Sequence, residues 1–281
     1  MVRKAVSLEY MKRDPVKHIA LPLVIEFCSQ FIMAFWGMMT EEPQRSHTIE
    51  ENGNSTVAIE APEKDYMMYT FVPAFQTGIS VWVTITLFAK MDAAPAQFNP
   101  AITMTLVVVG TVSPILFIPN TIAQMLGSLC AAFMSQVIRG APPQALIIPD
   151  EASSWSILAS EMIFVASFTI FAAELTQNPK NDDPLGAMGL AMAVFMSILS
   201  GKWTGVVCLN PTRVFGPAVL TGGDAWNRHW LIWIADLLGS AAAGLFWLIF
   251  LAPLDRSLLG RFRKKTRQSH KEDVLMDEMN T

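Results

Sequence analysis

The sequence has few charged residues and lacks the residue clusters that most often carry catalysis or bind metals. Asp, Glu, Lys and Arg make up 16% of its 281 residues, whereas hydrophobic residues make up 52% and the mean hydropathy is +0.37. This composition excludes an ordinary soluble domain. The four histidines are dispersed and the three cysteines lie in separate apolar segments, so they form no disulfide pattern or metal spacing.

Motifs of catalysis and of nucleic-acid binding are missing as well. The chain contains no H-E-x-x-H, no C-x-x-C and no Ser elbow, which argues against an enzyme. Its formal net charge is −4, and the basic residues gather near the two ends, so nucleic-acid binding has no support. We expect no enzyme activity, no cofactor and no metal site.

What the chain has instead is long hydrophobic segments. About 20 helical residues cross the hydrocarbon core of a bilayer, which is roughly 30 Å thick. Six segments approach that length: 19–39, 67–89, 115–138, 155–175, 185–200 and 230–252. The sequence therefore predicts an all-α membrane protein with six transmembrane helices. The predicted parts are a cytoplasmic N-terminal segment over 1–18, a membrane domain over 19–252 and a cytoplasmic tail over 253–281.

The distribution of charge predicts the orientation. The N-terminal segment has five basic residues and the tail has seven, and the positive-inside rule then places both ends in the cytoplasm. The loop over 41–65 must face outside; it holds seven acidic residues against two basic ones, and a glycosylation sequon at Asn54. We expect a multi-pass glycoprotein of the plasma membrane.

The second half of the chain repeats the first. Residues 123–128, AQMLGS, match residues 235–240, ADLLGS, and the Asn-Pro pairs at Asn99 and Asn210 match at nearly the same offset, 210 − 99 = 111. We place the repeats at 19–139 and 154–252. Each holds three crossings, so the second must lie inverted relative to the first. Transport proteins with inverted repeats bind their solutes near the midplane, where broken helices meet.

Each Asn-Pro pair marks the start of a short helix inside an apolar region. Asn is a favoured N-cap and Pro is favoured at the first helical position. About ten helix-compatible residues follow each pair, which is about half a membrane. Two such half-helices would meet at the centre, where non-helical backbone must be buried or line a watery cavity. We therefore predict a pore at Asn99 and Asn210. A third pair, Asn178-Pro179, precedes polar residues and is interpreted as a plain loop.

These features resemble the aquaporins, the major intrinsic protein family. The likeness covers nearly all of residues 19–252 and rests on QFNPAIT, CLNPTRVFGPAV, AQMLGS, two glutamates and His229-Trp230 with Trp233. It implies six helices plus two re-entrant half-helices in an inverted 3+3 repeat, one pore per subunit, and a homotetramer in the lipid bilayer.

The resemblance also implies roles for individual residues. Two glutamates hold the re-entrant loops, a doubled motif forms the pore centre, and an arginine with three further residues forms the selectivity filter. These residues are Glu26 and Glu161 for the loops; Asn99, Pro100, Ala101, Asn210, Pro211 and Thr212 for the motif; and Arg213, Val207, Ile198 or Ser197, and Thr77 or Ile79 for the filter.

Two residues depart from the family pattern. Thr212 stands where the second motif has Ala, and we expect its hydroxyl to hydrogen-bond the backbone or to alter the pore width. Asp236 stands where the family usually has Pro, and Gln124 holds the matching place in repeat one. A polar role in helix packing is expected for Asp236.

The function that the resemblance implies is a passive channel for water that excludes protons and ions. A wider filter for small neutral solutes, such as glycerol, urea, hydrogen peroxide or ammonia, is the alternative, because the predicted filter has no His or large aromatic residue. Val214, Ala218 and Trp233 are typical of the water-selective members. An ion-coupled transporter usually needs titratable groups at mid-depth, and neither half-helix tip has one.

Overall fold

The computed structural model describes residues 8–40, 46–51, 54–59, 71–88, 96–148, 150, 152–177, 184–201, 206–253, 257 and 260. The predictions for residues 1–7, for nearly all of the tail and for the Asn178-Pro179 loop fall outside the described residues.

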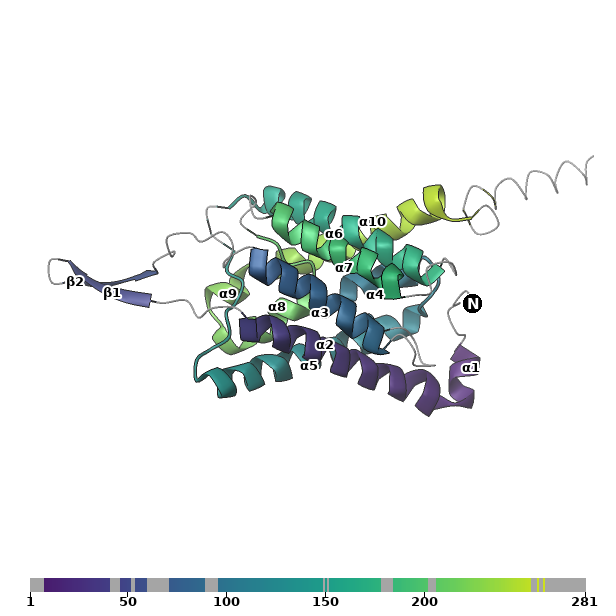
Figure 1. The fold of residues 1–281 in the computed structure, drawn as a ribbon, viewed down its shortest axis with the longest axis horizontal. Coiled ribbons are helices and arrows are strands. Elements are labelled where there is room, and N and C mark those ends of the chain that lie inside the picture. The colour runs from purple at the N-terminus through teal and green to yellow at the C-terminus, as the bar shows by residue number, and fades with distance from the viewer. Residues whose placement is uncertain are drawn as a thin grey trace, which may run out of the picture.

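Six long helices in the described part of the chain form a bundle (Figure 1). They are α2 (Leu21–Thr40), α3 (Val72–Phe88), α5 (Phe117–Arg139), α6 (Ser154–Gln177), α7 (Pro184–Gly201) and α10 (Trp230–Phe246). Each coincides with one of the six predicted segments, so the predicted helical architecture is confirmed. Within the described residues, four stretches are long and apolar enough to cross a membrane, namely Val16–Thr40, Pro114–Arg139, Ser154–Gln177 and Asp224–Leu251, while Val72–Phe88 and Gly186–Gly201 are shorter apolar helices.

Two short helices begin where the Asn-Pro pairs predict them, α4 (Pro100–Val108) and α8 (Pro211–Thr221). The remaining described elements are small. They are α1 (Leu8–Arg13), η1 (Val16–Ala20), η3 (Pro114–Leu116), α9 (Asp224–Asn227), η6 (Trp247–Leu251) and the strands β1 (Ser46–Glu51) and β2 (Asn54–Ile59).

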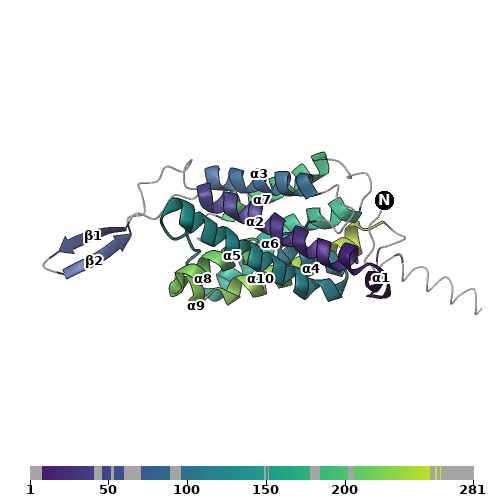
Figure 2. The ribbon, with the colours of Figure 1, turned by 90° about the horizontal axis from the view of Figure 1, so that it is seen from below.

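The two strands form an antiparallel hairpin in which Ser46 pairs with Ile59 and Glu51 with Asn54. Only a loop was expected here. The sequence nevertheless carries a signal, because Asn52-Gly53 between the strands is the residue pair that favours a two-residue hairpin turn. The hairpin stands at one end of the bundle, whereas α1 and the end of η6 lie at the other end (Figures 1 and 2).

The first and third helices of each repeat pack closely, α2 on α5 and α6 on α10. A Cβ at Gly127 would lie 2.5 Å from the Phe27 carbonyl oxygen, and a Cβ at Gly239 would lie 2.5 Å from Val165 Cγ1. Glycine therefore permits the same close crossing in both repeats, which explains why AQMLGS and ADLLGS correspond.

The half-helices cross between the repeats. Helix α4 packs on α10, where the Thr105 hydroxyl donates to the Ser240 carbonyl oxygen at 2.8 Å, and α8 packs on α5. A Cβ at Gly216 would lie 2.4 Å from the Ser128 carbonyl oxygen. Each half-helix thus rests on the third long helix of the other repeat.

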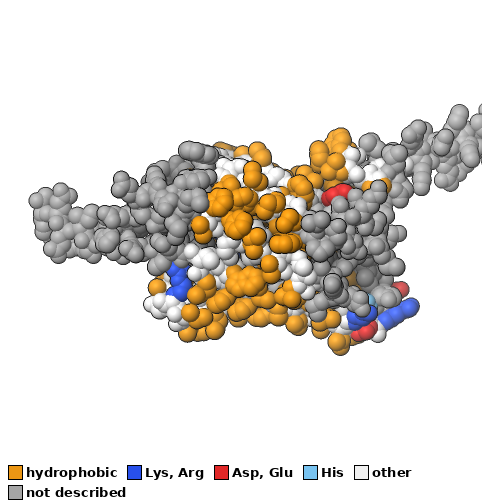
Figure 3. All heavy atoms as spheres, viewed as in Figure 1, with side chains coloured by type: hydrophobic (Ala, Val, Ile, Leu, Met, Phe, Trp, Pro, Cys, Tyr) orange, Lys and Arg blue, Asp and Glu red, His pale blue; other side chains and the backbone are white. Residues whose placement is uncertain are grey.

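The outer surface of the bundle is apolar. Large hydrophobic side chains along α5, such as Ile118, Ile122, Phe133 and Val137, are more than half exposed. In Figure 3 hydrophobic side chains cover the middle of the visible face, and most of the visible charged side chains lie toward its two ends. A bilayer is the environment that suits this distribution.

Candidate pore

Each half-helix begins at an asparagine whose side chain caps it. Asn99 Oδ1 accepts from the Ala101 N–H at 2.8 Å, and Asn210 Oδ1 accepts from the Thr212 and Arg213 N–H groups at 3.1 and 3.3 Å. Proline follows at the first helical position in both cases. Because the oxygens serve as caps, the amide nitrogens point away from their own helices.

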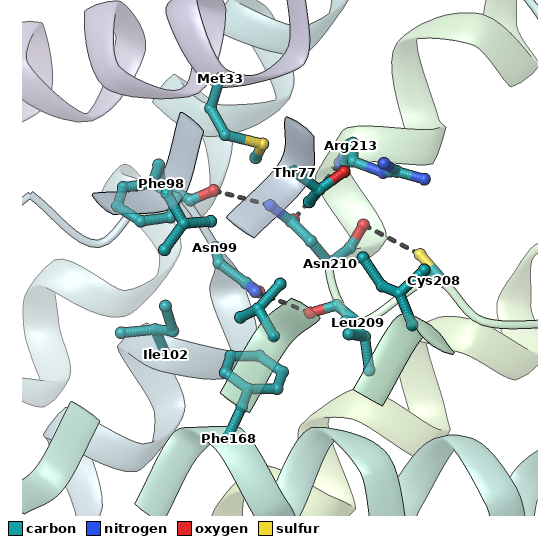
Figure 4. A pocket seen from close by; sticks show the side chains of 13 residues that line it. Met33, Thr77, Phe98, Asn99, Ile102, Phe168, Cys208, Leu209, Asn210 and Arg213 are labelled. Carbon is teal, nitrogen blue, oxygen red and sulfur yellow. Dashed lines mark hydrogen bonds between the residues drawn. The ribbon is translucent and has the colours of Figure 1, made fainter. Parts of the chain in front are cut away.

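Each of those amide nitrogens donates to the loop that precedes the opposite half-helix, at the join where the two half-helix N-termini meet. Asn99 Nδ2 donates to the Leu209 carbonyl oxygen at 2.7 Å, and Asn210 Nδ2 donates to the Phe98 carbonyl oxygen at 2.9 Å (Figure 4). The two helix tips are therefore hydrogen-bonded to each other. Since each carboxamide carries two N–H groups, this pairing uses one hydrogen of each.

The residue before each asparagine has a left-handed backbone. Phe98 has φ 43° and Leu209 has φ 62°, and among the described residues these are the positive φ values outside glycine. Such conformations are costly for bulky side chains and persist only where the surroundings fix them. Here the conformation turns the carbonyl of each residue toward the opposite asparagine.

Two buried glutamates hold the other side of these loops. Glu26 on α2 accepts from the Gln97 and Phe98 N–H groups at 2.9 and 2.8 Å. Glu161 on α6 accepts from the Cys208 N–H at 2.9 Å and from the Leu209 N–H. Phe98 and Leu209 are thus each held by two kinds of hydrogen bond. The N–H of each residue donates to a glutamate carboxylate, and its carbonyl accepts from an asparagine amide.

The hydroxyl of Thr212 donates to Asn210 Oδ1 at 2.8 Å and is fully buried. It therefore bonds a side chain, where a backbone partner had been the expectation. Three donors now converge on Asn210 Oδ1, which fixes the orientation of that carboxamide.

Gln30 lies at the same join and was missed by the sequence reasoning. Its carboxamide suits its neighbours best with the nitrogen toward the Phe98 carbonyl and the oxygen accepting from the Arg213 N–H at 3.3 Å. It thereby touches the loop of one half-helix and the first turn of the other. A polar residue four positions after Glu26, on the same helix face within an apolar span, was the available signal.

A small cavity adjoins the two asparagines, with a volume of about 20 Å³ open to the centre of a water molecule. Its walls are mostly apolar, with polar groups from Thr77, Asn99, Asn210 and Arg213 (Figure 4). Because a cavity needs about 10–15 Å³ of such volume to hold one water, this space accommodates a water beside the two asparagines. Phe168 lines it on the side of Ile102.

The filter positions left open by the sequence differ in their placement. Thr77 and Ile198 line the cavity, whereas Ile79 and Ser197 are not among its lining residues. The Ser197 hydroxyl instead donates to the Ala193 carbonyl oxygen at 2.8 Å. Val207 packs on the hydrophobic core beside the cavity and does not line it.

Within the described residues, one group of side chains has the composition of a metal site. Glu161, Cys208 and Asp236 are buried and offer ligand atoms within 4.8 Å of one another. Two of the three already serve the loop, because Glu161 accepts from backbone N–H groups and the Cys208 thiol lies 3.0 Å from the Asn210 carbonyl oxygen.

Comparison with known families identifies the class of protein. The sequence profile named Major intrinsic protein matches residues 20–247. The chain belongs to this family. Members of the major intrinsic protein family are membrane channels for water or small solutes and not enzymes, which agrees with the apolar helices and with the cavity between the half-helices.

Relatives of the chain come from animals, plants and fungi. Aquaporin-8 of Notomys alexis is 27% identical over 186 residues, covering 64% of this chain and 70% of the relative. Aquaporin-1 of Gibberella zeae is 26% identical over 250 residues, covering 85% and 72%. Among solved structures, the aquaglyceroporin of Plasmodium falciparum matches with a TM-score of 0.59 at 17% identity, covering 81% of this chain and 95% of that one. This last likeness shows that the two proteins share a fold.

Proposed function

We propose that this member of the major intrinsic protein family is a passive channel that conducts water and excludes protons and ions. The observation that carries the proposal is the crossed pair of hydrogen bonds between the half-helices, from Asn99 to Leu209 and from Asn210 to Phe98. It brings two helix N-termini and two carboxamides to one cavity.

The half-helix ends supply the electrostatic barrier. Each helix N-terminus carries a partial charge of about +0.5, and two of them at one point oppose a cation or a hydrated proton. The second N–H of each carboxamide donates to the oxygen of a passing water, which at Asn210 takes the place of the Gln30 carboxamide, 3.3 Å from Nδ2. A water held in this way by both asparagines directs its hydrogens outward, so it cannot accept a proton from the next water in the file.

Arg213 adds a full charge one turn into α8, at the cavity wall. In repeat one Ile102 takes the matching place, three residues after Asn99. The charged constriction therefore belongs to one side of the join, and we assign it to the outer side.

Transport of small neutral solutes is the second candidate. Thr77 and Ile198 line the cavity beside Arg213, and neither is a histidine or a large aromatic residue, which favours a wide filter. Val214, Ala218 and Trp233 favour water instead. We therefore propose water as the main solute, and glycerol, urea, hydrogen peroxide or ammonia as the alternative.

Stopped-flow light scattering on proteoliposomes tests both candidates. An osmotic gradient of an impermeant solute should shrink the vesicles faster than empty liposomes, while a pH-sensitive dye inside reports no added proton flux. Shrinkage at the rate of empty liposomes would refute the channel. A gradient of glycerol or urea should give lasting shrinkage for a water filter, and rapid re-swelling for the wider one.

We further propose a homotetramer in the plasma membrane with both termini in the cytoplasm and a glycan on Asn54. The hairpin that contains Asn54 and the helix α1 lie at opposite ends of the bundle (Figure 1), as this orientation requires. A glycosidase should raise the gel mobility of the protein from its native membrane but not of Asn54→Gln, and equal mobility of the two untreated proteins would contradict the glycan.

A further inference from the structure

The two repeats hold their loops with different chemistry. Beside Glu26, the Gln124 amide on α5 donates to Oε2 of the carboxylate at 2.7 Å. In repeat two the matching residue on α10 is Asp236, whose carboxyl group adjoins Glu161. An ionised aspartate has no hydrogen to donate. An ionised Asp236 therefore cannot make the hydrogen bond to Glu161 that the Gln124 amide makes to Glu26 in repeat one.

If Glu161 and Asp236 of repeat two were both ionised, several of their carboxylate oxygens would lack a hydrogen-bond donor. Glu161 Oε2 and both carboxyl oxygens of Asp236 are buried, and the described residues offer them no N–H or O–H donor. Glu161 and Asp236 are both fully inaccessible to solvent. Two adjoining carboxylates in such a place would repel each other and lack hydration, which is far costlier than an ordinary unpaired polar group.

The other charged or titratable groups around the pair do not remove this conflict. Arg213 on α8 is the cation that acts on Glu161, and the remaining neighbour is the thiol of Cys208. The guanidinium is half-buried at the cavity wall. One positive charge at that position cannot neutralise two buried carboxylates.

We propose that Asp236 and Glu161 share one proton, and that this proton supplies the hydrogen bond that the Gln124 amide supplies in repeat one. Asp236 is then a positioning residue. It fixes the Glu161 carboxyl group so that the other oxygen of Glu161 accepts from the Cys208 and Leu209 N–H groups. The left-handed turn at Leu209, and with it the carbonyl that Asn99 contacts, depends on this arrangement.

Infrared spectroscopy of the membrane-reconstituted full chain tests for the proton directly. At neutral pH a shared proton gives the C=O stretching band of a protonated carboxyl group. The difference spectrum between wild type and Asp236→Asn should show the loss of this band, because the asparagine amide donates without a titratable proton. Equal carboxyl absorbance in the two proteins would overturn the proposal.

Hydrogen exchange measured by mass spectrometry tests the positioning role. Asp236→Leu removes the donor and keeps the branched shape of the side chain, so the N–H groups of Cys208 and Leu209 should exchange about tenfold faster or more than in Asp236→Asn, as expected for one lost hydrogen bond to a charged group. The N–H groups of Gln97 and Phe98 are the internal control and should exchange alike in both variants. Equal protection of residues 208–209 in the two variants would also overturn the proposal.

The proposal relies on the proposed function only in treating this loop as part of the pore. Neither measurement depends on which solute passes, so a failure here is distinguishable from a failure of water transport. If Asp236→Leu does not fold, the infrared comparison with Asp236→Asn still decides.

Discussion

Replacing Glu26 with glutamine should destabilise the protein, whereas the same change at Glu161 should be nearly neutral. Glu26 accepts three hydrogen bonds, from the Gln97 and Phe98 N–H groups and from the Gln124 amide, and these occupy both of its oxygens. Glutamine has one oxygen, so whichever way its amide turns, an NH2 group must face a donor.

The structure sets the magnitude. At least one hydrogen bond to a charged group is lost, and each such bond contributes about 1.5–3 kcal/mol. At 1.4 kcal/mol per factor of ten, the opened form of the loop should become about 10- to 150-fold more populated.

In Glu161→Gln the outcome differs because Oε2 of Glu161 has no donor among the described residues. The new NH2 group can take that place and donate to Asp236, while the remaining oxygen keeps the Cys208 and Leu209 N–H groups. We expect less than about 1 kcal/mol of change, the value of an ordinary hydrogen bond.

Thermal unfolding of the two purified variants in detergent, followed by circular dichroism, provides the comparison. About 1 kcal/mol shifts the midpoint by about 2–4 °C in chains of about 150–250 residues, so Glu26→Gln should unfold several degrees below wild type. Equal midpoints for the two variants, or a lower one for Glu161→Gln, would refute the reasoning from donors and acceptors.

Three further predictions follow from contacts in the bundle and the pore. Gly127→Ala should lower the free energy of unfolding by about 1–3 kcal/mol, because its Cβ would lie 2.5 Å from a backbone oxygen. Gly37→Ala, whose Cβ would meet nothing within 4 Å, should instead stabilise α2 by up to about 1 kcal/mol. Equal unfolding midpoints for the two variants would contradict this. Thr212→Val should lose about 1 kcal/mol of stability with its bond to Asn210 Oδ1, and unchanged denaturation would disprove that role. Arg213→Ala should raise cation leak in proteoliposomes while water flux persists; an unaltered leak would leave the arginine without a part in charge exclusion.

The half-helices could be predicted from the sequence because their starting signals are local. Asn at the N-cap and Pro after it act through the geometry of a single turn, and two such pairs at matching repeat positions mark the same turn twice. The structure begins α4 at Pro100 and α8 at Pro211. The six long helices were equally accessible, since hydrophobic length is a property of each segment alone.

Contacts that depend on helix rotation could not be predicted in the same way. The repeat alignment paired Gln124 with Asp236, but only the bond from Gln124 to Glu26 reveals that Asp236 occupies a donor's position. Gln30 is a similar case, because a polar side chain in an apolar helix can face lipid, a neighbour or the pore, and the sequence does not specify which. The Thr212 hydroxyl donates to Asn210 Oδ1 because of the rotamer of Thr212, and a sequence pattern does not encode a rotamer.

The pore is a property of both repeats together. The bonds that join the half-helices link residues 110 and 112 positions apart in the sequence, and each half-helix rests on the third long helix of the other repeat. A single repeat in a membrane would leave its loop carbonyl, at Phe98 or Leu209, without the asparagine that satisfies it, and an unsatisfied backbone group in hydrocarbon costs several kcal/mol. Contacts so distant in sequence also form late, after the local helices exist. The left-handed turns before both asparagines should therefore be adopted only when the two halves meet, which couples the folding of the chain to the formation of its pore.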